Sequence, residues 1–366
     1  MKHEKKLFKY QLIHDALAAR IAAGLLEQLP SEEEIGKEFN AGRNIVRQAL
    51  QMLADEEYII KEQGKRSRIC RLKFSDPVKT AKLVFLQRYN YLGGNFNPVY
   101  SGIISKLLEI AAARSCRLEM LYLPSQENMQ YAKFVADTLR DADGIFLTAI
   151  RSGETAPELE KILTAHARTV CVDNNVGSLG KFRVGTDNYA GGWLAAEKIA
   201  ASGRKKPLIY GCGDTVFSYS PIFERILGFQ DGCRKKLGSF NRAEQLIADE
   251  APPEFHTIFE RIKSAFESGN SFDVVFALTD QAAIHVVRAL RLLGKRVPED
   301  VAVIGFDGIA EHSPFSELSS VRQNIEEVAR SSFAVMEKLL RNELVTGSVL
   351  LAPPKFKAGN TLPATI

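Results

Sequence analysis

Residues 40–68 read NAGRNIVRQALQMLADEEYIIKEQGKRSR, a stretch that begins with apolar periodicity and ends in a basic glycine turn. At 100° per residue, one arc of a helix over residues 43–55 collects apolar side chains: Val46, Ala49, Leu50 and Leu53. The opposite arc holds side chains that can all donate hydrogen bonds, with no acid among them: Arg43, Asn44, Arg47, Gln48 and Gln51. The apolar arc predicts attachment to a small domain. The polar arc carries the groups that bind base edges in the DNA major groove or grip phosphates.

The residues on either side predict the rest of that domain. A helix is expected over residues 10–23 with Gly24 as its stop. Ser31 and Glu34 form an S-x-x-E capping box that opens a short second helix ending near residue 39. Beyond the third helix, residues 58–60 and 67–69 are expected to be strands around a turn containing Gly64. Three helices and a hairpin predict a helix-turn-helix followed by a wing.

Charge is unevenly distributed along the chain, although the net charge is only +4. Residues 61–73 contain six basic side chains against one acid, whereas residues 32–57 are mostly acidic. Any surface helix has a polar arc, so the arc on residues 43–51 alone would fit a simple solvated helix. Together with the basic hairpin it indicates a surface that meets nucleic acid.

The stretch LPSEEEIGKEFNAGRNIVRQALQMLADEEYIIKEQGK resembles the GntR family of winged-helix repressors, and the resemblance covers about residues 8–70. It implies that Arg43 and Arg47 contact DNA and that Asn44 lies among the base-reading positions. It also implies a wing tip that contacts DNA, formed by Gln63, Gly64 and Lys65 with Arg66 beside them.

The chain departs from the family pattern at three places before the wing. Gly42 stands where a serine is usual and Ile45 where a threonine is usual, so a phosphate-contacting hydroxyl is lost. Glu33 stands where the second helix often has a basic residue. The wing itself reads KRSR instead of a GTF-like sequence.

After residue 80 the pattern changes to short β-rich runs separated by amphipathic helices. The runs lie at residues 83–86, 118–123, 144–150, 169–173, 207–211, 274–278 and 301–307. Strands that alternate with helices are typical of βαβ units and a parallel sheet. The region is too long for one sheet, so we expect two α/β lobes. Residues 71–80, basic and with one proline, read as the linker.

Composition and motifs narrow the class of protein. The chain has 366 residues, 45% apolar and 25% charged, which is typical of a globular protein of two or three compact units. Its five cysteines are scattered without a CxxC pair, which predicts reduced thiols, no metal site and a cytoplasmic location. No signal peptide or membrane-spanning run is recognised. The G-x-G-x-x-G pattern fails at Val216, and no other nucleotide, metal or nucleophile motif is found, so no catalytic residue and no cofactor are predicted.

The segment FDVVFALTDQAAIHVVRALRLLGKRVPEDVAVIGFDG at residues 272–308 resembles the LacI/GalR family, whose effector domain shares the fold of periplasmic sugar-binding proteins. Further matching segments are NPVY at 97–100, DGIF at 143–146, VGTDNYAGG at 184–192 and RILGFQDG at 225–232. The resemblance implies that the effector is contacted by four residues: Tyr100, Asp173, Arg225 and Asp280. Thr279 stands where asparagine is more usual.

These four residue types also suit a sugar on chemical grounds. Carboxylates accept hydroxyl protons, an arginine donates a planar fork, and an aromatic ring covers the C–H face. Each lies near the carboxyl end of an expected strand, where open α/β sheets bind ligands. Other roles are open: Asp280 as a helix N-cap, Arg225 in a surface ion pair, and Tyr100 in ordinary packing.

A winged helix on a LacI-like body is similar to the arabinose-repressor type of bacterial regulator. The expected architecture is a winged helix-turn-helix at residues 1–70, a linker at 71–80, and a two-lobed effector-binding and dimerisation domain at 81–366. We expect a dimeric repressor of sugar-utilisation genes that binds double-stranded operator DNA and a small sugar-like effector, without contact to a membrane. The alternatives are a sugar-binding transport protein and a small-molecule metabolic enzyme.

Overall fold

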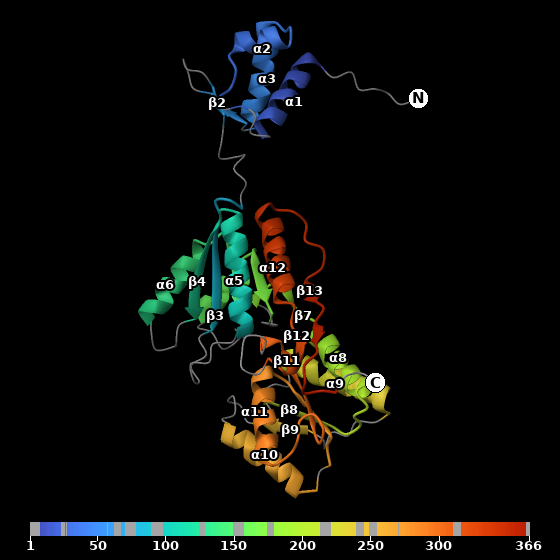
Figure 1. Ribbon diagram of the computed structural model, residues 1–366. Helices are drawn as coiled ribbons and strands as arrows, with labels where there is room; N and C mark the ends of the chain where they lie inside the picture. The colour runs from blue at the N-terminus through green and yellow to red at the C-terminus, as the bar shows by residue number, and fades with distance from the viewer. Residues whose placement is uncertain are drawn as a thin grey trace. The chain divides into compact units, whose positions relative to one another are not determined.

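The computed structural model of the chain divides into two units, Met1–Thr80 and Ala81–Ile366 (Figure 1). The residues that it describes are 8–22, 26, 28–56, 58–61, 67–69, 78–88, 98–123, 129–148, 157–173, 179–212, 221–238, 245–248, 255–269, 271–309 and 316–363.

The described residues of the first unit form three helices and a two-stranded hairpin. They are α1 (Lys9–Ala22), α2 (Glu32–Glu38), α3 (Arg43–Asp55), β1 (Ile59–Ile60) and β2 (Arg68–Ile69). The capping box closes as predicted, because the Glu34 amide donates to the Ser31 hydroxyl at 3.2 Å and the Ser31 amide donates to the Glu34 carboxylate at 2.6 Å. β1 and β2 pair antiparallel. The predicted helix-turn-helix with a following hairpin is therefore confirmed. The wing tip, Gln63 to Arg66, lies outside the described residues.

An apolar core fixes the orientation of α3 in this unit. Val46, Ala49 and Leu53 are fully buried and pack with Ile13 and Leu17 of α1. Burying one such aliphatic side chain contributes about 1.5–3 kcal/mol, so the whole arc strongly favours a single rotation of the helix. That rotation leaves the arginine and amide arc in solvent.

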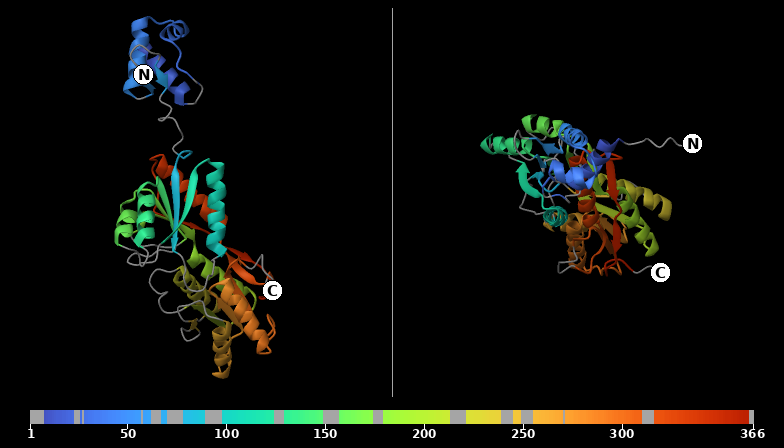
Figure 2. Two further views of the ribbon diagram at one scale, coloured as in Figure 1. Left: turned by 90° about the vertical axis from the view of Figure 1, so that its left-hand side faces the viewer. Right: turned by 90° about the horizontal axis from the view of Figure 1, so that it is seen from above.

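The first sheet of the second unit has the strand order β13-β7-β6-β5-β3-β4, and all its pairs are parallel. Its strands are β3 (Lys82–Arg88), β4 (Arg117–Leu123), β5 (Gly144–Thr148), β6 (Thr169–Val172), β7 (Phe182–Thr186) and β13 (Val349–Ala352). Side chains alternate between the two faces of β3, so Val84 packs beneath α6 and α7 while Phe85 faces the side of α5 and α12 (Figures 1 and 2). These helices are α5 (Pro98–Ala113), α6 (Met129–Arg140), α7 (Pro157–Ala165) and α12 (Ile325–Leu340).

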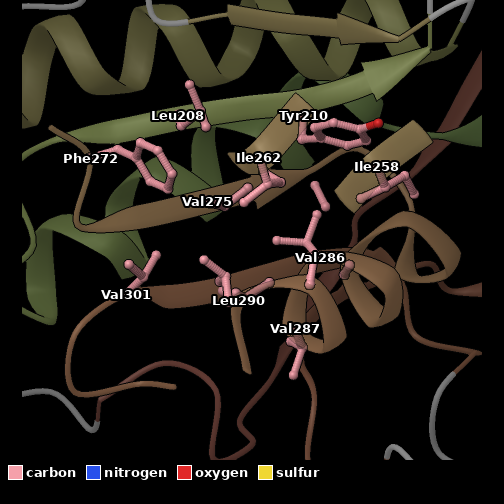
Figure 3. Packing of buried hydrophobic residues seen from close by; sticks show 14 of the residues in the cluster. Leu208, Tyr210, Ile258, Ile262, Phe272, Val275, Val286, Val287, Leu290 and Val301 are labelled. Carbon is pink, nitrogen blue, oxygen red and sulfur yellow. The ribbon is translucent and has the colours of Figure 1, made fainter. Parts of the chain in front are cut away.

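The second sheet has the order β14-β12-β11-β10-β8-β9, with only β14 antiparallel. Its strands are β8 (Pro207–Cys212), β9 (Gln245–Ala248), β10 (Val274–Ala277), β11 (Ala302–Asp307), β12 (Ser319–Arg322) and β14 (Lys355–Lys357). Helices α10 (Phe255–Glu267) and α11 (Asp280–Leu292) cover one face, where Val275, Ile262 and Leu290 interlock (Figure 3). Helices α8 (Asn188–Ala201) and α9 (Pro221–Leu237) cover the other.

The chain passes between the two sheets three times. β7 leads into α8, β12 leads into α12, and β13 leads into β14. The passages are bonded to one another: the Asp187 amide donates to the Ala352 carbonyl at 3.0 Å, and the Thr186 hydroxyl donates to the Gln323 amide oxygen at 2.7 Å. Three adjoining passages therefore connect the two lobes.

The two predicted α/β lobes are confirmed, but the structure contains strands that the sequence did not predict. The runs at residues 182–186, 245–248, 319–322, 349–352 and 355–357 were not predicted as strands. They are short, with three to five residues each, and short runs are weak signals of a strand. β13 exposes three of its four side chains although its sequence, VLLA, is apolar throughout. Within the described part of the chain, no helix combines the length and apolarity needed to cross a membrane.

Candidate functional site

The exposed face of α3 is the first candidate site. Arg43, Asn44, Arg47, Gln48 and Gln51 are all exposed, as the periodicity predicts. Gly42 precedes the helix without a side-chain cap, which agrees with the loss of the hydroxyl usual at that place. Guanidinium and amide donors thus line about two and a half turns of a surface helix, and a helix of this kind fits the major groove of DNA.

An acid from a neighbouring helix reaches this face. Glu32, at the start of α2, accepts from Arg47 Nε at 3.0 Å, and the two side chains are 39% and 61% exposed. An ion pair this exposed contributes about 0–1 kcal/mol, so a phosphate or a base edge can replace the carboxylate. Gln51 is also engaged, donating to Asp55 at 2.6 Å and accepting from Lys61 at 2.8 Å.

The second candidate site is a buried polar cluster that spans both sheets of the second unit. Asp173 follows β6 of the first sheet, Asp307 ends β11 of the second, and Arg225 lies in the first turns of α9. Asp173 has φ +68° and Asp307 has φ +117°. Non-glycine residues in such strained backbone regions concentrate at functional sites.

Arg225 is the hub of the cluster. Its Nε donates to the Asn188 amide oxygen at 2.9 Å, and its Nη1 donates to the Leu278 carbonyl at 2.6 Å. Nη1 lies 3.1 Å from Asp307 Oδ1, and the guanidinium carbon lies 3.7 Å from the centre of the Phe306 ring. The residue is only 4% exposed, so the alternative of a surface ion pair is wrong.

Burial disfavours the charged form of the two carboxyl groups beside Arg225, those of Asp173 and Asp307. Burial raises the pKa of Asp173, an effect that Arg225 opposes and the nearby Asp307 strengthens. Burial likewise raises the pKa of Asp307, against Arg225 and a hydrogen bond from Gln323 Nε2 at 2.8 Å. Asp173 Oδ1 is buried and has no hydrogen-bond partner. An unsatisfied buried acceptor of this kind is costly unless a water or a ligand supplies a donor.

Asp280 lies behind the cluster and is fully buried. Its Oδ1 accepts from the Ser320 hydroxyl at 2.5 Å and its Oδ2 accepts from the Ile309 amide at 2.8 Å. Its own amide donates to the Asp307 carboxylate. The N-cap of α11 is Thr279, so the alternative role of Asp280 as the cap is wrong. Asp280 therefore holds the turn that carries Asp307.

Tyr100 lies in the first turn of α5 and is half-buried. Since α5 follows β3, this turn lies at the carboxyl edge of the sheet where Asp173 follows β6. Residues 89–97, which lead into the turn, are outside the described residues. Contact between the tyrosine ring and a ligand stays a prediction.

Sequence reasoning missed four members of the cluster: Thr186, Asn188, Asp307 and Gln323. Asp307 ends the run VAVIGFD, and a polar residue at the carboxyl end of a buried parallel strand is a usable signal. Asn188 lies inside the recognised segment VGTDNYAGG. Gln323 had no such marker, because its importance comes from a contact with Asp307 that only the fold creates.

Glycines place Arg225 against α8. A Cβ added at Gly192 would lie 2.0 Å from the Arg225 carbonyl oxygen, and one at Gly228 would lie 1.9 Å from the Tyr189 carbonyl oxygen. The backbones of α8 and α9 therefore touch, and the two helices lie side by side (Figure 1). This contact brings Asn188 at the start of α8 within reach of the guanidinium.

A surface cavity of about 300 Å³ lies elsewhere, beside α6, with Lys82, Arg117, Phe134 and Asp137 in its wall. It shares no lining residue with the polar cluster. Among the residues that the structure describes, no group of three His, Cys, Asp or Glu side chains is arranged to hold a metal ion.

Comparison with protein families assigns both units. Residues 9–69 match the family described as "Bacterial regulatory proteins, gntR family", and residues 201–362 match "Periplasmic binding protein-like domain". This chain joins a GntR-type helix-turn-helix domain to a periplasmic-binding-protein-like domain. The GntR-type domain contains the α3 face, and the matched part of the second domain contains Arg225, Asp280 and Asp307.

Curated relatives of this two-domain chain are bacterial transcriptional regulators. It is 22% identical over 322 residues to the arabinose metabolism transcriptional repressor of Geobacillus stearothermophilus, covering 83% of each chain. It is 24% identical over 195 residues to the ribose operon repressor of Lactococcus lactis subsp. lactis (strain IL1403), covering 53% of this chain and 57% of that one. An uncharacterized HTH-type regulator, YvdE of Bacillus subtilis (strain 168), is 23% identical, with 60% and 66% covered. The chain thus spans less than two thirds of the last two proteins.

Solved structures share the fold. The transcriptional regulator CelR in complex with cellobiose superposes with a TM-score of 0.64 at 18% identity, covering 95% of this chain and 98% of that chain. A LacI family regulator from Enterococcus faecium with bound ribose gives 0.61 at 18% identity, covering 77% and 99%. Both confirm the expected α/β architecture of the periplasmic-binding-protein-like domain.

Proposed function

We propose that the protein is a sequence-specific DNA-binding transcriptional regulator that represses sugar-utilisation genes and responds to a small sugar-like effector. The observation that carries the proposal is the presence, in one chain, of an exposed arginine–amide helix face and a two-sheet domain with a buried polar cluster at its crossing passages. Relatives named as repressors of ribose and arabinose genes support it. Such a regulator acts in the cytoplasm, where its operator DNA is.

In this proposal α3 enters the major groove. Arg43, Asn44 and Arg47 read base edges, and Arg47 leaves Glu32 to do so. The expected wing residues Gln63, Gly64, Lys65 and Arg66 also contact DNA, and Lys65 and Arg66 bind backbone phosphates. Base readers and phosphate binders are separable, because losing a bidentate base contact costs about 1–3 kcal/mol at one base pair while losing a phosphate contact weakens every sequence alike.

The effector site of the proposal is the polar cluster. Asp173 and Asp307 accept hydroxyl protons, and Arg225 donates from its planar guanidinium. Tyr100 covers the C–H face of the sugar, and Asp280 supports the Asp307 turn from behind. Since these groups come from both sheets, a bound sugar links the two lobes.

Lobe closure is the proposed signal. Gln323 Nε2 donates to Asp307, and Gln323 Oε1 accepts from Thr186 at the crossing passages, so one side chain connects the effector site to the passages between the lobes. In a homodimer, closure changes the separation of the two DNA-binding domains. When the two DNA-binding domains match the spacing of palindromic half-sites, binding of one raises the effective concentration of the other at its half-site, and a changed separation removes this gain.

DNA binding tests the proposal directly. Fluorescence anisotropy with DNA from upstream of the protein's own gene should give salt-dependent binding to a palindrome, and a sugar should change the affinity. Arg43→Ala and Arg47→Ala should each lower affinity about 5- to 150-fold and relax preference at one base pair, whereas Lys161→Ala on α7 should not. Wild-type affinity in the Arg43→Ala, Arg47→Ala double variant would exclude this DNA-binding surface.

A further inference from the structure

One ion pair of the second unit joins the two lobes directly. Arg183 lies in β7 of the first sheet, and Glu224 lies in the first turn of α9, which packs on the second sheet. Arg183 Nη1 and Nη2 each donate to Glu224 Oε1 at 3.2 Å, and Nη2 also donates to Oε2 at 3.3 Å. Because the two residues belong to different lobes, a movement that separates α9 from β7 breaks this pair.

The Arg183–Glu224 pair is partly shielded from solvent. The side chain of Arg183 is 15% exposed and that of Glu224 is 34% exposed. Water and salt screen an ion pair in this setting less than they screen one at the surface. The pair therefore favours the lobe arrangement in which it forms.

Asp173 is a second acidic group near Arg183, and it belongs to the same lobe. β6 and β7 are parallel neighbours with Cys171 opposite Arg183, and Asp173 follows β6 with its amide donating to the Val184 carbonyl at 2.7 Å. From strand spacing and rise, the Cα atoms of Arg183 and Asp173 are about 8 Å apart, a distance that an arginine side chain spans. Burial raises the pKa of Asp173, and the charge of Arg183, after that of Arg225, opposes this rise.

Arg183 and Asp173 each have a buried polar atom that can take part in such a contact. Arg183 Nε and Asp173 Oδ1 have no hydrogen-bond partner among the described residues. Both Nη atoms of Arg183 donate to Glu224. Since a guanidinium bonds a carboxylate best through two parallel donors, a paired contact with Asp173 requires Arg183 to release Glu224.

We propose that Arg183 changes partner when the two lobes move: it pairs with Glu224 when the lobes are together and with Asp173 when they are apart. The proposal rests on the proposed lobe closure and names the residue that sets its balance. Arg183 has one carboxylate partner in each arrangement, so neither arrangement leaves its charge unpaired, and the two can be close in free energy. A ligand that engages Asp173 removes the partner of the open arrangement and so favours closure.

The distance between the lobes tests the proposal in the full-length protein without any ligand. Pulsed electron paramagnetic resonance would measure it between spin labels at Lys133→Cys on α6 and Glu260→Cys on α10, two exposed positions on different lobes. Cys70 and Cys212 would be replaced by serine, and the other three cysteines are buried. Excess unlabelled protein would limit the signal to distances within one chain.

The two acidic partners should shift the lobes in opposite directions. Glu224→Gln should raise the ratio of open to closed lobes at least about fivefold, because it weakens only the closed pairing. Asp173 also faces Arg225 and Asp307 of the other lobe, so its effect is measured both with Arg183 and in Arg183→Met, where that contribution is the same. With Arg183 present, Asp173→Asn should lower the open-to-closed ratio at least about fivefold more than it does in Arg183→Met.

The matched control is Glu197→Gln, which removes a carboxylate that pairs with Lys236 at 3.0 Å within one lobe and should leave the distance unchanged. An unchanged distance distribution in Glu224→Gln overturns the proposal. An effect of Asp173→Asn that is equal in both backgrounds also overturns it, because Arg183 would then be a fixed partner of Glu224. In either case sugar-dependent DNA binding by the wild-type protein would still support the proposed function, so the two failures are distinguishable.

Discussion

Arg225→Met gives the sharpest test of the buried cluster. Methionine keeps the length and apolar body of the side chain but removes the guanidinium that contacts Asn188, the Leu278 carbonyl and Asp307. The buried carboxyl groups of Asp173 and Asp307 then lose the cation that stabilises their charged forms against the effect of burial. The expected result is a less stable second unit, in addition to any loss of effector binding.

The magnitude follows from the burial of the pair. Removing one partner of a buried ion pair costs about 3–5 kcal/mol, because the remaining charge is left uncompensated. Arg225 is 4% exposed and the Asp307 side chain 12% exposed, so little solvent screening reduces this value. At about 2 °C per kcal/mol for a domain of this size, the melting temperature of the second unit should fall by about 6–10 °C.

Differential scanning calorimetry of the full-length protein measures the change, and the first unit serves as an internal reference because it contributes no residue to the cluster. Arg140→Met is the matched control, since Arg140 forms exposed ion pairs with Asp137 and Glu158 that contribute about 0–1 kcal/mol each. Adding Asp307→Asn to Arg225→Met should restore part of the loss, because a neutral amide is less costly to bury alone. A melting temperature for Arg225→Met within about 2 °C of the wild type would refute the reasoning, and would mean that both carboxyl groups are neutral in the native protein.

Three further outcomes follow from contacts described above. Gln323→Leu should leave DNA affinity without sugar unchanged but reduce the sugar-induced change in that affinity at least about fivefold, because it cuts the bonds to Asp307 and Thr186; equal responses in anisotropy titrations would contradict this. Gly228→Ala should destabilise the second unit by about 1–3 kcal/mol or more in calorimetry, since its new methyl would lie 1.9 Å from the Tyr189 carbonyl oxygen. Glu32→Gln should raise DNA affinity by up to about fivefold by releasing Arg47 from an exposed ion pair, and a fall in affinity would indicate that Glu32 positions the arginine for DNA.

The first unit was accessible from sequence because its contacts are local. The apolar arc Val46, Ala49, Leu50 and Leu53 has only one way to be buried, and the structure buries all four. The capping box needs two residues three apart in the chain. Glu32 was the exception: it lies 15 residues from Arg47, and only the packing of α2 on α3 brings the two side chains together.

In the second unit the alternation of strands and helices was enough to predict two α/β lobes. It could not predict which strands share a sheet. β13 pairs with β7 and β14 pairs with β12, and these partners lie far apart in the chain. Hydrogen bonding between strands depends on the backbone alone, so such pairings leave little trace in residue types. The three passages between the sheets depend on these strand pairings, so the sequence did not predict them either.

The sequence by itself therefore determined the features that depend on neighbouring residues. These are the helices of the DNA-binding domain, the alternation of strands and helices, and the position of single polar residues, such as Asp173 and Arg225, at strand ends and helix starts. Only the tertiary structure decided which of these meet. It placed Arg225 in contact with Asp307, and it paired Asp280 with Ser320. It also left Asp173 Oδ1 without a hydrogen-bond partner. The physical reason is that burial and charge depend on every group within a few ångströms, and in a two-sheet domain those groups arrive from passages of the chain more than a hundred residues apart, as Thr186 and Gln323 do.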